Sequence, residues 1–309
     1  MLKQRLGAAG NLSVQQFIVF EAVFEEGSYS AAARRLGQAV PSTWEQIKSL
    51  EKTYQAKLFD RRGRQIVATA AADELIKAIQ PILAGIRSSF ELLDEHEERV
   101  PQRITLATGV RMMLDEVAPM LRRFQQEYRG VPLRLINADN RVSQRHVLEG
   151  TADVALMLEP TPDMAHSAIS YRPAYSIDYL AVMPKRHRLA KKKAISLADL
   201  VESPVIVGHQ GTVGRRLLEQ ALHTNGLLGK LRVSAETDNS AVTIACARAG
   251  LGIGVLAGAA DGSQLRQLAT HSLRKHLGQA RIVSLTRKGR QPTNAMRRLL
   301  EIIHENEDA

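Results

Sequence analysis

The run from residue 28 to residue 69 constrains the fold of this 309-residue chain more than any other segment. It reads SYSAAARRLGQAVPSTWEQIKSLEKTYQAKLFDRRGRQIVAT. We expect Ser30 to cap a first short helix, because a serine hydroxyl accepts an orphan backbone N–H. Gly37 should end that helix in a left-handed conformation, and Pro41 suits the first turn of a second helix. A basic hairpin follows, so the order of parts is that of a helix-turn-helix with a wing.

The second helix is predicted to have one buried and one polar face. Ile47, Leu50 and Tyr54 recur at helical spacing and form the apolar stripe. Residues 27–66 carry eight basic and three acidic side chains, whereas the first hundred residues are neutral overall. Such a local excess suits phosphate contacts, although a solvated helical hairpin with ordinary surface charge is the alternative. The side chains expected to contact DNA are Ser30, Arg34, Pro41, Ser42, Thr43, Trp44, Gln46, Lys48, Lys52, Arg61, Arg62 and Arg64.

The same segment resembles the winged helix-turn-helix of LysR-type transcriptional regulators. The residues that carry the resemblance are Phe17, Phe20, Ser28, Ala31, Ala32, Leu36, Pro41, Gln46, Ile47, Leu50, Glu51, Leu58, Phe59, Arg61, Arg64, Thr69 and Ala71. The chain departs from the family at Ala39 and Val40, where Ser-Gln is usual, and at Trp44 and Glu45, where a serine and a basic or polar residue are usual. An absent helix cap costs about 0.5–2 kcal/mol. These departures bear on the operator sequence and leave the fold prediction intact.

A long amphipathic helix is predicted after the wing, between residues 69 and 98. Its apolar side chains alternate in steps of four and three, which is typical of a seam that packs on a partner helix. The resemblance implies dimerisation through this linker, although a helix folded back on its own domain is the alternative. Pro81 should kink the helix. The expected seam consists of Leu75, Ile79, Ile82, Ile86, Phe90 and Leu93.

Beyond an acidic connector, strands and helices alternate, which predicts a parallel sheet covered by helices. The fold class is therefore α/β: an N-terminal winged helix-turn-helix (1–68), a long linker helix (69–98) and an effector-binding domain (99–309). Two strand–helix cycles divide the last domain into lobe I (about 102–178 and 274–305) and lobe II (about 179–273). The resemblance implies that this domain is similar to periplasmic solute-binding proteins.

A ligand is expected between the lobes, at the carboxyl ends of the strands. Several helix N-termini should meet there and favour an anion, because their backbone N–H groups are unpaired. Some of these side chains have the alternative role of plain helix caps. The candidate ligand-binding residues are Thr108, Gly109, Arg111, Asn140, His209, Gly211, Thr212, Asn239 and Ser240.

Composition narrows the remaining function classes. The net charge of +10 favours nucleic acid and small anions as partners. The single cysteine, Cys246, allows no internal disulfide, and no metal-ligand spacing or catalytic motif is present, so we expect neither an enzyme nor a cofactor. We find no signal peptide and no apolar stretch of membrane-spanning length, which favours a cytoplasmic protein.

The sequence therefore predicts a DNA-binding regulator switched by a small, anionic effector. Its expected partners are double-stranded DNA, that effector and further copies of itself in a homodimer or homotetramer, with RNA polymerase as a further candidate. The alternative is a solute-binding or transport-type protein without a DNA function, which would leave residues 13–96 unexplained.

Overall fold

The computed structural model describes residues 10, 12–62, 65–96 and 103–305, and divides the chain into two compact units. Unit 1 comprises Met1–Glu97 and Arg287–Gln291, and unit 2 comprises Glu98–Thr286 and Pro292–Ala309. The two units are described separately below.

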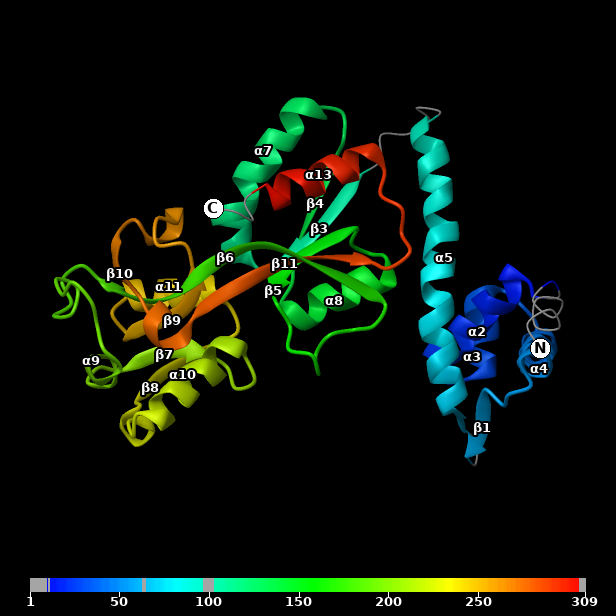
Figure 1. Cartoon of the computed structure of the whole chain (residues 1–309), viewed down its shortest axis with the longest axis horizontal. Coiled ribbons are helices and arrows are strands. Elements are labelled where there is room, and N and C mark those ends of the chain that lie inside the picture. Colours follow the sequence, from blue (N-terminus) through cyan, green and yellow to red (C-terminus); the bar gives the residue numbers. More distant parts are fainter. Residues whose placement is uncertain (1–9, 11, 63–64, 97–102, 306–309) are drawn as a thin grey trace. The chain divides into compact units, whose positions relative to one another are not determined.

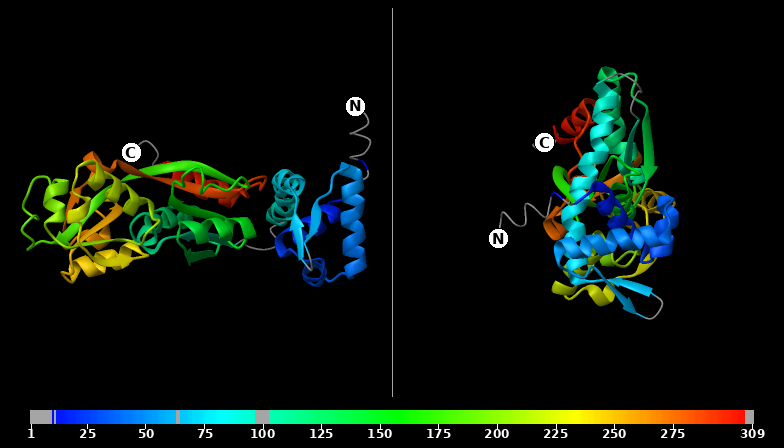
Figure 2. Two further views of the ribbon diagram at one scale, coloured as in Figure 1. Left: turned by 90° about the horizontal axis from the view of Figure 1, so that it is seen from below. Right: turned by 90° about the vertical axis from the view of Figure 1, so that its right-hand side faces the viewer.

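Unit 1 is a three-helix cluster followed by a hairpin and a long helix (Figure 1). The elements are α2 (Val14–Glu26), α3 (Tyr29–Leu36), α4 (Val40–Tyr54), β1 (Phe59–Arg62), β2 (Gln65–Ala68) and α5 (Ala70–His96). Helices α2, α3 and α4 pack on one another, and β1 pairs antiparallel with β2. The predicted helix-turn-helix and wing are thus present, and the hairpin projects beyond the helices (Figures 1 and 2).

Local chemistry explains where these helices begin and end. Ser13 and Gln16 form a capping box at the start of α2. The cap of α3 is Ser28, whose hydroxyl accepts from the Ala31 amide, so the prediction of Ser30 as the cap is wrong. Gly37 ends α3 with a φ of 63°, as predicted. Either serine could cap by residue type, and the helix begins at Tyr29, directly after Ser28.

The turn before α4 lacks a side-chain cap, as its sequence predicts. Ala39 occupies the N-cap position and makes no side-chain hydrogen bond, while a proline lies in the first turn. The C-cap of α4 is Gln55, the one described non-glycine residue with positive φ, at 53°. The N-terminus of α4 therefore depends on packing more than on side-chain capping.

The core of unit 1 joins the three helices to the wing and to the beginning of α5. It contains Val19, Phe20, Ala22, Val23, Ala32, Ile47, Leu50, Leu58, Phe59, Ala72, Ile76 and Ile79. Helix α5 continues through Pro81 as one element. Its first half thus packs against the helix-turn-helix, which was the alternative considered for the linker.

Unit 2 is built on a nine-stranded sheet among its described residues, with the order β4-β3-β5-β11-β6-β9-β7-β8 and β10 paired to β6. The strands are β3 (Ile104–Thr108), β4 (Leu133–Asn137), β5 (Val154–Leu158), β6 (Ile169–Pro184), β7 (Val205–Gly208), β8 (Val233–Thr237), β9 (Ile253–Gly258), β10 (Leu268–Ser272) and β11 (Gln279–Arg287). Strands β3, β4 and β5 are mutually parallel, and so are β7, β8 and β9. Strands β6 and β11 run antiparallel to these two groups and lie between them.

The order of the strands places helices on both faces of the sheet. The chain steps from β3 to β4 in one direction and from β4 to β5 in the other, and right-handed crossovers then put α7 and α8 on opposite faces. The same reversal recurs in β7, β8 and β9 around α10 and α11. The helices are α6 (Val110–Met112), the π-helix η1 (Met113–Val117), α7 (Ala118–Glu127), α8 (Asn140–Glu149), α9 (Leu197–Val201), α10 (Val213–Thr224), α11 (Ser240–Arg248), α12 (Arg274–Leu277) and α13 (Asn294–His304), with 3-10 turns η2 (Leu228–Lys230) and η3 (Ser263–Leu265).

Two features of unit 2 differ from the sequence prediction. Strand β6 has sixteen residues, Ile169–Pro184, and it runs antiparallel to its neighbour β9, whereas a parallel sheet was predicted. The first helical segment begins at Val110 and contains the π-helix turn η1, which the alternation of strands and helices does not predict. Such turns are rare and occur frequently at functional sites.

Candidate nucleic-acid interface and effector site

The exposed face of α4 presents two kinds of surface. Helical geometry of about 100° per residue places Val40, Trp44 and Lys48 in a row along one edge of α4, beside the buried face that contains Ile47 and Leu50. Val40 is 41% exposed and Trp44 is 48% exposed. The Lys48 ammonium lies 5.6 Å from the centre of the Trp44 ring, a cation–π geometry. This edge is apolar at its N-terminal end and basic at its centre.

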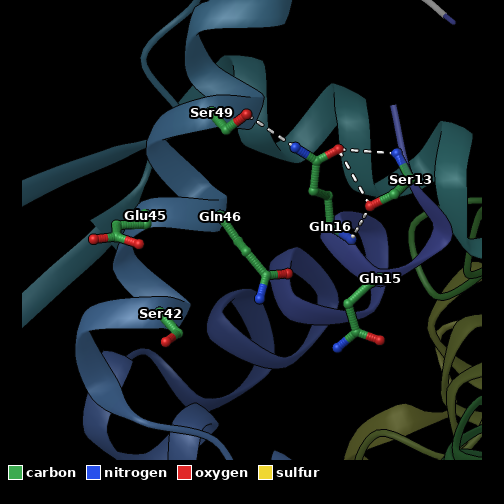
Figure 3. Close-up of a pocket in the computed structure, with 7 residues that line it drawn as sticks. All are labelled: Ser13, Gln15, Gln16, Ser42, Glu45, Gln46 and Ser49. Atoms are coloured by element: carbon green, nitrogen blue, oxygen red, sulfur yellow. Dashed lines mark hydrogen bonds between the residues drawn. The ribbon is translucent and has the colours of Figure 1, made fainter. Parts of the chain in front are cut away.

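The other edge of α4 borders a polar groove of about 490 Å³ against the N-terminus of α2. Gln16 of α2 spans the base of the groove and donates to the Ser49 hydroxyl at 3.0 Å. The buried Gln46 side-chain oxygen has no hydrogen-bond partner among the described residues. The lining residues, all polar, are Ser13, Gln15, Gln16, Ser42, Glu45, Gln46 and Ser49 (Figure 3).

Glu51 connects α4 to the wing. Its carboxylate accepts from the backbone amides of Leu58 and Phe59 at 2.8 and 3.3 Å, and from Lys48 at 2.6 Å. Burial disfavours the charged carboxylate, but these hydrogen bonds outweigh it and hold the pKa of Glu51 below its ordinary value. One ionised side chain therefore adds a polar link between α4 and the hairpin to the apolar core that they share.

The residues expected to contact DNA are distributed unevenly over this surface. Arg34, Pro41, Ser42, Trp44, Lys48, Lys52 and Arg61 are exposed, Ser30 is exposed within α3, and Gln46 is partly buried. Thr43 is fully buried and donates to the Ala39 carbonyl, so its hydroxyl does not face solvent. Arg64 and the side chain of Arg62 lie outside the described residues.

The expected ligand-binding residues of unit 2 lie at the carboxyl ends of parallel strands, as predicted from the alternation. Gly109 and Asn140 begin the helices that follow β3 and β4, while Thr212 and Asn239 are the N-caps of α10 and α11. Asn239 accepts from the Ala241 amide, which is the plain capping role considered above. Ser240 is the first residue of α11, and Gly211 has a φ of 92°.

Several of these side chains already have partners within unit 2. The Thr108 hydroxyl is fully buried and lies 3.5 Å from the Met112 sulfur. Asn140 donates to the Leu158 carbonyl, the Thr212 hydroxyl donates to the His209 carbonyl, and the exposed His209 ring contacts the Gln210 carbonyl. A ligand at this edge of the sheet would compete with short-range loop contacts.

Arg111, a predicted ligand-binding residue, belongs to a buried cluster with Glu116 and Tyr175. These two residues were not identified from the sequence. The Arg111 guanidinium is 2.5 Å from the Glu116 carboxylate, and both side chains are at most 10% exposed. The second Glu116 oxygen and the buried Tyr175 hydroxyl have no hydrogen-bond partner among the described residues. Burial raises the pKa of Glu116 despite the nearby Arg111, and burial together with Glu116 raises the pKa of Tyr175.

The spacing of this pair explains why it could not be found in the sequence. Ion pairs within an α-helix join residues three or four apart, whereas Arg111 and Glu116 are five apart. The π-helix turn η1 spans Met113–Val117 and so alters the helical register between them.

The described part of unit 2 also contains a cavity of about 380 Å³ beside the two antiparallel strands. It lies next to the start of α10 and the end of β5, and none of the expected ligand-binding residues lines it. Its lining residues are Leu158, Glu159, Ser176, Tyr179, Val213, Leu217, Gln279, Ala280 and Arg281.

The described residues contain no cluster of three or more metal-ligating side chains. Within the same ranges, none of the helices has the length and apolar character needed to cross a membrane.

Comparison with known families and proteins agrees with this architecture. Residues 14–73 match the bacterial regulatory helix-turn-helix protein, lysR family, and residues 97–308 match the LysR substrate binding domain. The RuBisCO operon transcriptional regulator of Allochromatium vinosum is 30% identical over 282 residues, which are 90% of this chain and 86% of that protein. The transcriptional activator CmpR of a Synechocystis species is 26% identical over 80% of this chain and 79% of its own.

Solved structures show the same fold over nearly the whole chain. CbnR complexed with its target DNA has a TM-score of 0.57 at 18% identity and covers 96% of this chain and 100% of that one. Full-length OxyR from Pseudomonas aeruginosa has a TM-score of 0.63 at 13% identity, covering 96% and 94%. With a family match over both units, the chain belongs to the LysR family of DNA-binding transcriptional regulators.

Proposed function

We propose that this regulator holds operator DNA between the exposed face of α4, inserted in the major groove, and the wing, which contacts the backbone. The observation that carries this proposal is the solvent exposure of three basic side chains, with Lys48 and Lys52 on the C-terminal half of α4 and Arg61 on strand β1 of the wing. Arg62 and Arg64 add charge to the wing in sequence. Thr43 is left out of the proposed contacts because its hydroxyl is buried.

The wing proposal is tested with the double substitution Arg61→Ala and Arg64→Ala. Loss of two phosphate contacts should weaken binding similarly for all DNA sequences and flatten the dependence of log K on log salt by about 2. Fluorescence anisotropy with labelled duplexes at several salt concentrations measures both quantities. Unchanged affinity and slope would show that the wing does not contact DNA.

We also propose that the effector is a small anion bound at the carboxyl ends of the parallel strands of unit 2. The supporting features are the N-termini of α8, α10 and α11, which follow these strands and carry the positive ends of the helix dipoles. The basic excess beyond residue 100, where 29 Lys and Arg face 19 Asp and Glu, favours the same sign of ligand.

Thermal denaturation with mono- and dicarboxylates, sulfate and phosphate, and with alkylammonium ions as controls, tests the charge of the effector. An anion should raise the melting temperature in a concentration-dependent way. Thr108→Val and His209→Ala should reduce this shift without changing basal DNA binding. Stabilisation by the cations alone, or an undiminished shift in both variants, would contradict the proposal.

We further propose that the protein acts in the cytoplasm as a homodimer or homotetramer, with RNA polymerase as a candidate partner at the promoter. Membership of a family of DNA-binding regulators supports the location and the candidate partner. The exposed apolar side chains Ile82, Phe90 and Leu93 of α5 support the oligomer.

A further inference from the structure

The N-terminal half of α4 exposes more apolar surface than a DNA-contacting helix needs for phosphate binding. Val40 and Trp44 are four residues apart, so they lie one above the other on the same face. They are 41% and 48% exposed, whereas Ile47 in the second turn is buried. An isolated exposed apolar side chain is ordinary. Two that are aligned on the exposed side of one helix instead suggest a surface that binds another molecule.

The Trp44 ring is held in place by its neighbours. Lys48 covers it at 5.6 Å, and the same ammonium is fixed by Glu51 at 2.6 Å. Glu51 in turn is anchored by the Leu58 amide. The ring is therefore linked through Lys48 and Glu51 to the base of the wing, which favours one ring orientation before binding.

The surroundings identify the partner as a DNA major groove. Lys48 and Lys52 lie on the same exposed face, which suits an anionic partner rather than an apolar protein surface. The N-terminal residues of a recognition helix are the ones that reach base edges. In the major groove, the apolar group presented by a base is the 5-methyl of thymine.

We propose that Val40 and Trp44 form an apolar reading surface for a thymine 5-methyl group, and so determine operator specificity. This inference rests on the proposed docking of α4 in the major groove. It goes beyond that docking because it assigns a base to two named side chains. The polar groove lined by Ser42, Glu45 and Ser49 lies on the other edge of α4, so hydrogen-bonded base recognition and apolar recognition are separated on one helix.

The experiment begins with selection of preferred duplexes from a random library by the full-length protein. Each thymine of the selected site is then replaced singly by deoxyuridine, which removes only the methyl group. At one or two positions we expect the affinity to fall about fourfold, the factor given by burying one methyl-sized group. Trp44→Ser and Val40→Ser should bind the thymine and uracil duplexes equally well, because the apolar contact is gone.

Arg61→Ala provides the matched control. It should weaken binding to the thymine and uracil duplexes by the same factor, because phosphate contacts carry no base information. Uracil tolerated at every position by the wild-type protein would overturn the inference, and so would an undiminished uracil penalty in both serine variants. Either result leaves the docking of α4 intact. Selection of no duplex at all would instead contradict the docking.

Discussion

Glu51 shows how a single residue connects the two DNA-binding parts of unit 1. Its side chain is 11% exposed and binds the wing amides and Lys48 together. Replacing it by glutamine keeps one acceptor but removes the charge, and charge-assisted hydrogen bonds are stronger than neutral ones. We expect Glu51→Gln to destabilise unit 1 by about 1–2 kcal/mol at pH 7. The fluorescence of Trp44, the only tryptophan, reports the unfolding of this unit.

The effect of Glu51→Gln on the stability of unit 1 should depend on pH. The pKa of Glu51 is lowered in the folded state, so its stabilising contribution is present above its unfolded-state pKa and is lost as the pH falls through its folded-state pKa. The stability difference between wild type and Glu51→Gln should therefore be constant near neutral pH and shrink below about pH 4. A difference that grows on acidification would contradict the assigned sign.

The buried pair of Arg111 and Glu116 makes a second prediction at the residue scale. Glu116→Gln leaves the guanidinium buried without its counter-charge and should destabilise unit 2 by about 3–5 kcal/mol. The double variant Arg111→Met with Glu116→Leu removes both charges and should recover most of that loss. Chemical denaturation followed by circular dichroism measures both. Equal losses in the single and double variants would show that packing around the side chains matters more than their charge.

At the element scale, some apolar residues of α5 pack in the core of unit 1, and others are exposed and available to the proposed dimer seam. Ile76 and Ile79 are buried in the core of unit 1, whereas Ile82, Phe90 and Leu93 are 51%, 66% and 62% exposed. Leu75 packs at the edge of that core, and Ile86 is partly buried. The solvent-exposed part of the proposed dimer seam therefore consists of Ile82, Phe90 and Leu93.

We expect Ile82→Asp with Phe90→Asp to convert the protein to monomers, because two charges would enter an apolar interface. Since both side chains are exposed within unit 1, its fold should survive. Light scattering measures the mass, and Lys77→Glu, about 140° away round the helix, is the control that should remain oligomeric. Stable dimers of the double variant would exclude this seam.

At the scale of the whole molecule, the two units have separate hydrophobic cores. A fragment of residues 99–309 should therefore fold alone and retain its response to the effector anion without binding DNA. A fragment of residues 1–98 should bind the operator without any response to the anion. Gel shifts and thermal melts of the fragments, alone and mixed, check this, and an unfolded 99–309 fragment would show that the cores depend on each other.

Much of this protein is determined by local sequence. The left-handed Gly37 and the uncapped Ala39 follow from residue types whose conformational preferences act within a few bonds. The apolar spacing in α4 and the alternation of strands and helices beyond residue 100 are likewise short-range patterns, so the helix-turn-helix and the α/β class could be predicted from them.

Only the tertiary structure decided which partner each residue has. Ser28 rather than Ser30 caps α3, and Ile79 packs inward although it continues the pattern of the exposed Ile82. The length of β6 and the pairing of Arg111 with Glu116 across a π-helix turn also escape local patterns. The physical reason is that periodicity fixes which residues share a face of an element, whereas burial depends on what packs against that face from distant parts of the chain.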